Sequence, residues 1–93
     1  MKHQVFPSDK AFKKQLGLFL KKKRVSAGLT QRNVARHFDF TTAQYISLWE
    51  RGVSAPSLIA LKELVRLYEM DREEVISLFE SNLHRILRSS VDE

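Results

Sequence analysis

The sequence of 93 residues contains no cysteine, only three glycines and two prolines, and no long apolar run. Without cysteine, neither a disulfide nor a thiolate metal site can form, which fits a reducing compartment. No apolar run approaches the roughly 18 residues of a membrane-spanning helix, and residues 1–7 lack the apolar core of a secretory signal. We therefore expect a soluble, cytoplasmic protein, and its length allows a single domain.

The sequence also lacks the groupings of residues that catalysis and metal binding require. His3, His37 and His84 are far apart, and none has a helical i, i+4 partner that would suggest a metal site. Three scattered glycines cannot form a phosphate-binding loop. Glu73 and Glu74 are adjacent and therefore point apart, which suits a helix start better than acid–base work. We predict no enzymatic activity, no metal and no cofactor.

Charge is unevenly distributed along the chain. Residues 1–51 carry eleven Lys or Arg and three acidic residues, a net charge of +8, whereas residues 52–93 carry five Lys or Arg and eight acidic residues, a net charge of −3. Such a dipole turns one face toward a polyanion, either nucleic acid or an anionic membrane surface. The basic residues do not accompany a lipid-sized apolar helix face, which disfavours the membrane. A solvated basic surface without a partner is the alternative.

The spacing of apolar residues predicts helices, and no period-2 alternation predicts a strand. We expect helices that begin after Ser8 or Asp9, at Thr30, at Thr41 or Thr42, at Pro56-Ser57, and at Asp71, where Glu74 completes a capping box. Gly28 and Gly52 end the first and third helices, and the fifth runs to about Ser89. The expected inward residues are Phe12, Leu16, Phe19, Leu20, Val34, Ala35, Phe38, Ile46, Trp49, Leu58, Leu61, Leu64, Val65 and Tyr68.

The third predicted helix has an unusual outward face. Before its closing Glu50 and Arg51 it has no charge, and its outward residues are Thr42, Ala43, Gln44, Ser47 and Leu48. Solvated helix faces usually carry Lys and Glu, whereas small neutral groups suit the major groove of DNA. Glutamine can pair with adenine, and alanine or the threonine methyl can touch the thymine methyl. A plain surface helix is the alternative.

Several short stretches follow one another at a defined spacing: Gly28-Leu29-Thr30-Gln31, Val34-Ala35, Ile46-Ser47, Trp49-Glu50-Arg51-Gly52 and Pro56-Ser57-Leu58. They resemble the helix-turn-helix family of phage Cro and cI repressors and their bacterial relatives, the xenobiotic-response-element type. The resemblance covers residues 12–79 and implies an all-α, five-helix lambda-repressor-like domain with an extended C-terminal helix, whose second and third helices bind DNA. We divide the chain into this domain at residues 8–80 and a helix extension with a frayed end at residues 81–93.

One departure from the family pattern lies between Ala35 and Glu50, where this chain is one residue longer than the commonest spacing. The additional aromatic residue, Phe40, is expected to pack over the corner between the second and third helices.

The resemblance implies a role for particular side chains. Those expected to read bases are Thr42, Ala43, Gln44 and Leu48, and those expected to hold phosphates are Gln31, Arg32, Tyr45 and Arg51. Arg24 and Glu50 match a partly buried structural salt bridge, because a carboxylate there needs a partner and arginine offers a bidentate one. Tyr45 could instead pack against the first helix, and Leu48 could contact a partner protein.

The end of the sequence predicts a dimer interface. Ile76, Phe79, Leu83 and Ile86 recur at spacings of three and four residues, the seam of a short coiled coil, and Leu87 adds to it. We predict a homodimer, because two copies related by a two-fold axis read two half-sites. The alternative is that these residues fold back on residues 5–6 (Val5 and Phe6) and on the first helix of the same chain.

Together these features predict a sequence-specific regulator of transcription that binds double-stranded DNA, with repression as the predicted direction. Its place would be the nucleoid of a bacterium or of a phage host cell. A protein-interaction module on the same scaffold, such as an antitoxin or an anti-repressor, is the competing hypothesis, because folds are reused. The +8 charge of residues 1–51 favours DNA, since a module that binds only protein has no need to keep it.

Overall fold

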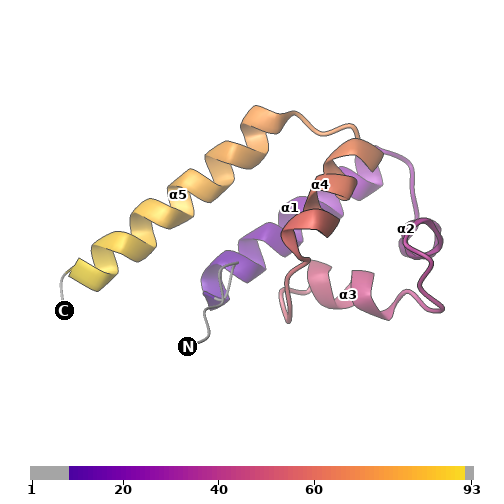
Figure 1. The fold of residues 1–93 in the computed structure, drawn as a ribbon, viewed down its shortest axis with the longest axis horizontal. Coiled ribbons are helices and arrows are strands. Elements are labelled where there is room, and N and C mark those ends of the chain that lie inside the picture. The colour runs from indigo at the N-terminus through magenta and orange to yellow at the C-terminus, as the bar shows by residue number, and fades with distance from the viewer. Residues whose placement is uncertain (1–8, 92–93) are drawn as a thin grey trace.

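The computed structural model describes residues 9–91, and the side chains of residues 9–88. This part of the chain forms five helices and no strand: α1 (Lys10–Ser26), α2 (Gln31–His37), α3 (Gln44–Glu50), α4 (Leu58–Leu67) and α5 (Arg72–Val91). Figure 1 shows α2, α3 and α4 gathered around one end of the molecule, while α5 runs back along the direction of α1 with opposite polarity. The predicted all-α architecture of five helices is confirmed.

Local hydrogen bonds fix where most helices begin. The Asp9 carboxylate accepts from the Phe12 amide at 3.0 Å, and the Thr30 hydroxyl accepts from the Asn33 amide at 3.0 Å. The Asn33 side-chain oxygen accepts in turn from the Thr30 amide, so α2 begins with a reciprocal capping box. These side chains replace the missing backbone partners of the first helical turn.

One predicted helix start and one predicted capping arrangement differ from the structure. α3 begins at Gln44, later than expected, because residues 41–43 form a bend and the Thr42 hydroxyl accepts only from the Gln44 amide, at 3.2 Å. At α5, Asp71 accepts from the amide of Glu73 at 3.0 Å. Glu74 does not reach back to close the predicted capping box, because its carboxylate pairs with Lys23 at 2.6 Å.

The hydrophobic core lies between α1 and the three short helices. Its buried members are Leu16, Leu20, Val34, Ala35, Ile46, Trp49, Leu61, Leu64, Tyr68, Met70 and Val75. The inward assignment of Leu58 is wrong: its side chain is 66% exposed. The core-facing side of α4 is set by Leu61, Leu64 and Tyr68, and Leu58 precedes that stripe in the first turn. Met70 and Val75 were not predicted, because they lie in and beyond the link from α4 to α5.

The middle of α5 packs against the start of α1 through polar and aromatic contacts. The rings of Phe12 and Phe79 meet edge to face, with centroids 4.7 Å apart. Asn82 is buried and donates to the Gln15 side chain at 3.1 Å, and Arg85 pairs with Asp9 at 2.7 Å. The hydrogen bond from Arg85 lowers the pKa of Asp9. The division at residue 80 stays a prediction, while α5 continues across it without a break.

The backbones of α1 and the end of α3 lie very close together. A Cβ atom at Gly17 would lie 2.6 Å from the carbonyl oxygens of both Trp49 and Glu50. Gly52, which follows α3 with φ of +75°, leaves no more room, since a Cβ there would lie 2.8 Å from the Cα of Lys14. Glycine at these positions lets the two backbones touch, and α3 is thereby fixed on α1 at its C-terminal end.

We predict that Gly17→Ala destabilises the protein although alanine is the better helix former. The gain in helix propensity is about 1 kcal/mol, but the new methyl would overlap two backbone carbonyls that cannot rotate away, and overpacking costs about 1–3 kcal/mol. Urea denaturation should therefore give a lower free energy of unfolding. Ser26→Ala, at an exposed position of the same helix, is the control and should be neutral or stabilising. A Gly17→Ala protein more stable than wild type would contradict this account.

Candidate nucleic-acid interface

The two short helices α2 and α3 are held at a fixed angle by the turn between them. The Phe40 amide donates to the Ala35 carbonyl at 2.9 Å, and Asp39 adopts a left-handed conformation with φ of 64°. Val34 and Ala35 of α2 and Ile46 of α3 are buried on the inner side of this turn. Each helix has seven residues, too few to be stable alone, so this shared core determines their relative placement.

Aromatic rings cover the corner between α2 and α3. Phe38 and Phe40 stack with centroids 5.5 Å apart, and Phe40 also meets Trp49 at 6.1 Å and Tyr45 at 5.0 Å. The expectation that Phe40 packs over this corner is confirmed. Tyr45 is exposed, and its ring contacts the ring of Phe40 in the turn. The additional residue of the turn therefore adds packing that stiffens the approach to α3.

A second attachment fixes α2 on α4. The His37 Nε2 atom at the end of α2 lies 2.7 Å from the Glu63 Oε2 atom, and Arg66 lies 3.9 Å from the same carboxylate. The hydrogen bond with His37 lowers the pKa of Glu63. Both partners are partly exposed, so this contact contributes modestly to stability, but it links the C-terminal end of α2, next to the turn, to α4.

Arg24, Glu50 and Gln31 form a hydrogen-bonded network where α1, α2 and α3 meet. Arg24 donates through Nε and Nη2 to the two oxygens of Glu50 at 2.7 and 3.1 Å, and through Nη1 to the carbonyl of Leu29 at 2.8 Å. Gln31 Nε2 donates to Glu50 Oε1 at 2.9 Å. The Glu50 side chain is only 3% exposed. The bond with Glu50 raises the pKa of Arg24, and burial raises the pKa of the nearby Tyr68 phenol.

The outward face of α3 carries no charged side chain before Glu50 and is partly exposed. Gln44 and the preceding Thr42 are exposed, while Ala43, Ser47 and Leu48 are half-buried. Arg51, just after the helix, is exposed and donates from Nε to the Ser47 hydroxyl at 3.1 Å. The structure therefore presents a neutral helix surface with an arginine at its end, the arrangement of groups that a major groove and its bordering phosphates can accept.

A helix-turn-helix family model matches residues 20–75, more than half of the chain. The chain belongs to the Cro/cI-type helix-turn-helix family. No curated protein and no solved structure matches the sequence. Membership in this helix-turn-helix family identifies the protein as a DNA-binding regulator with the lambda-repressor-like all-α fold, and its helix-turn-helix consists of α2, the turn and α3.

The residues assigned to phosphates lie in the first turn of α2, in the first turn of α3 and just after α3. Arg32, in the first turn of α2, and Tyr45, in the first turn of α3, are exposed. Arg51 is exposed beyond the last turn of α3, whereas Gln31 is partly buried and already bonded to Glu50. Sequence reasoning missed that this bond places Gln31 in the structural network, because the two residues are 19 positions apart. Whether these residues contact DNA stays a prediction.

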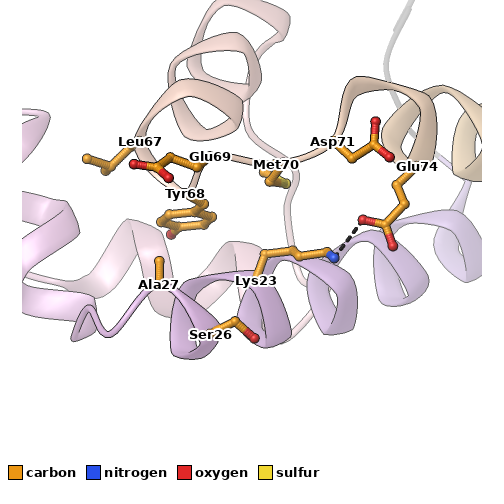
Figure 2. A pocket seen from close by; sticks show the side chains of 9 residues that line it. All are labelled: Lys23, Ser26, Ala27, Leu67, Tyr68, Glu69, Met70, Asp71 and Glu74. Atoms are coloured by element: carbon orange, nitrogen blue, oxygen red, sulfur yellow. Dashed lines mark ion pairs between the residues drawn. The ribbon is translucent and has the colours of Figure 1, made fainter.

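A hollow lies on the side of α1 that faces the start of α5. Figure 2 shows Lys23 extending from α1 to Glu74 on α5, with Tyr68 and Met70 along the wall, while the Asp71 carboxylate turns away. Lys23 and Glu74 both line this hollow, and the Lys23 Nζ atom pairs with the Glu74 Oε1 atom at 2.6 Å. This arrangement explains how the first turn of α5 is attached to α1, and we assign the hollow to the packing of that helix.

Within the described residues, no group of three His, Asp or Glu side chains could hold a metal ion. Among the same residues, no helix is long and apolar enough to span a bilayer.

We predict that Glu50→Ala unfolds the protein more readily and impairs DNA binding only as a consequence. The change leaves the Arg24 guanidinium buried without its carboxylate, and breaking a buried pair in this way costs about 3–5 kcal/mol. Thermal and urea denaturation measure the loss directly. Glu80→Ala, which removes an exposed carboxylate of α5, is the matched control and should change stability by less than about 0.5 kcal/mol. A Glu50→Ala protein with wild-type stability but no DNA binding would assign Glu50 to recognition instead.

Proposed function

We propose that this regulator binds specific double-stranded DNA sequences in the cytoplasm and represses transcription, with α3 in the major groove. The observation that carries the proposal is the uncharged, partly exposed face of α3, held by buried contacts at its inner side and followed by an exposed arginine. A helix with fixed position and neutral hydrogen-bonding groups can discriminate bases, since discrimination requires side chains held in register with the base edges. A repressor of this kind acts by occupying its operator and needs no catalytic residue.

The candidate side chains on α2, on α3 and beside the ends of α3 divide into two proposed classes. Thr42, Ala43, Gln44 and Leu48 read bases: Gln44 offers a bidentate amide to adenine, and the other three offer methyl groups to thymine. Gln31, Arg32, Tyr45 and Arg51 hold the phosphates on either side of the groove. Arg51 is the strongest of these, because its Nε bond to Ser47 orients the guanidinium and leaves the terminal nitrogens available.

We predict that Gln44→Ala and Arg51→Ala weaken DNA binding in different ways. Selection from a random duplex pool supplies an enriched site, and a scrambled duplex of the same length supplies the comparison. Gln44→Ala should weaken binding to the enriched site by roughly 1–3 kcal/mol and relax the preference at one base pair. Arg51→Ala should weaken binding to both duplexes alike and reduce the log–log salt slope by about one unit.

Two outcomes of these titrations would contradict the assignments. Equal losses on enriched and scrambled duplexes for Gln44→Ala would remove Gln44 from the base readers. A wild-type protein with no preference for any duplex, over the whole range of salt, would contradict the proposal of a specific regulator and favour the protein-interaction hypothesis.

We further propose that the protein acts as a homodimer through the outer face of α5. Ile76, Leu83 and Leu87 are exposed and lie seven and four residues apart, so they fall within a stripe about 40° wide at 100° per residue. Phe79, predicted for the same interface, is half-buried against Phe12, and Ile86 is also half-buried. We therefore narrow the proposed interface to the exposed stripe, with Ile86 at its edge. A two-fold axis would place the stripes of two copies against each other.

We predict that Leu83→Glu combined with Leu87→Glu converts the dimer into a monomer without unfolding it. The two leucines are exposed, so the added charges oppose only a second copy of α5. Sedimentation over a concentration series measures the state of association, and circular dichroism checks the helices. The control is Leu58→Glu on α4, where the leucine is also exposed, and this variant should leave the dimer intact. A wild-type chain that sediments as a monomer throughout the series rules the dimer out.

A further inference from the structure

A hollow of about 610 Å³ lies between the outer face of α1 and the end of α3. Its walls carry three basic side chains that come from distant parts of the sequence: Lys14 and Lys21 on α1, and Arg51 after α3. The two lysines are seven residues apart, so they project from the same side of α1 two turns apart. The structure thus brings a face of α1 beside the residue that ends α3.

The hollow is electropositive because its carboxylate is already neutralised. Glu50 contributes to the wall, but both of its oxygens accept bonds from Arg24 and one also accepts from Gln31. Lys14, Lys21 and Arg51 make no ion pair within the described residues and are exposed. Three unpaired cations around one concave surface favour binding of a polyanion.

The same surface exposes apolar groups between its charges. Leu18 of α1 is 68% exposed and Val53, after α3, is 55% exposed, and both line the hollow. A mixture of cations and small apolar side chains matches a nucleic-acid backbone, which alternates charged phosphates with the less polar faces of its sugars. A free inorganic anion would not cover Leu18 and Val53.

We propose that this hollow binds the phosphate backbone of DNA outside the bases that α3 reads. The proposal rests on the proposed function, because it takes α3 to lie in the major groove. With α3 in the groove, Arg51 at its end is next to the bordering strand, and Lys14 and Lys21 continue the positive surface away from the groove. The lysines of α1 thereby add affinity and salt dependence, while base preference stays with α3.

The test compares two double variants with the same loss of charge. Lys14→Gln with Lys21→Gln removes both lysines of the hollow. Lys22→Gln with Lys62→Gln removes two exposed lysines that do not line it. Binding of each full-length protein to the enriched duplex and to the scrambled duplex is measured by fluorescence anisotropy at several salt concentrations.

We expect the Lys14 and Lys21 variant to reduce the log–log salt slope by about two units on both duplexes, since each neutralised phosphate contributes about 0.9. The Lys22 and Lys62 variant should keep a slope close to that of the wild type. The ratio of affinities for the enriched and scrambled duplexes should be unchanged in both variants, because neither alters α3.

The outcomes separate this proposal from the proposed function. Equal slopes for the two double variants would overturn the phosphate-binding hollow while leaving specific DNA binding intact. A wild-type protein without preference for the enriched duplex would instead overturn the proposed function. Binding of the wild type to vesicles of anionic phospholipid, with no binding to either duplex, would overturn both and assign the cations to a membrane surface.

Discussion

The buried ion pair of Arg24 and Glu50 is the interaction on which the rest of the structure depends. Arg24 belongs to α1, Glu50 ends α3, and the remaining bonds of the pair reach the Leu29 carbonyl and the Gln31 side chain at the start of α2. Removing two charges from water is expensive, and a pair is tolerated only when every polar atom finds a partner. Here the guanidinium and both carboxylate oxygens are bonded, so the pair specifies how three helices meet.

At the same place in the fold the backbones of α1 and α3 are in close contact. Gly17 allows the carbonyls of Trp49 and Glu50 to contact α1 directly, and this contact brings the carboxylate of Glu50 within reach of Arg24, seven residues further along the helix. Sterics and electrostatics therefore select one position for the C-terminal end of α3. At its other end the ring of Phe40 contacts Tyr45 in the first turn of α3, and its outer face needs no charge of its own to stay in place.

Sequence reasoning succeeded where the determining contacts are local. Asp9 and Thr30 were identifiable as helix caps because their partners lie three residues away. The stripe of Leu61, Leu64 and Tyr68 was recognisable from its helical spacing alone. Leu58 was assigned inward wrongly, because an apolar residue in the first turn of a helix satisfies the same spacing without reaching the core.

What the sequence could not reveal depends on contacts between distant positions. Asn82 and Gln15 are 67 residues apart, and neither residue type signals that one will be buried against the other. The grouping of Lys14 and Lys21 with Arg51 likewise requires knowledge of how α1 lies against α3. The family resemblance supplied the Arg24 and Glu50 pair, whereas composition and periodicity could not have paired them across 26 positions.

Buried and exposed charges consequently have different tasks in this molecule. The buried charges of Arg24 and Glu50 satisfy each other and define the geometry, so they add no net charge to the surface. The exposed lysines and arginines of α1–α3 are then free to give that side its positive potential, while eight of the eleven acidic residues of the sequence follow α3. On α5, a buried polar residue likewise stands beside an exposed apolar one. Asn82 is bonded to α1 and fixes the rotation of α5. Because that rotation is fixed, Leu83, the next residue along, must face outward. A polar contact inside the chain thereby determines which apolar residues of α5 are left exposed.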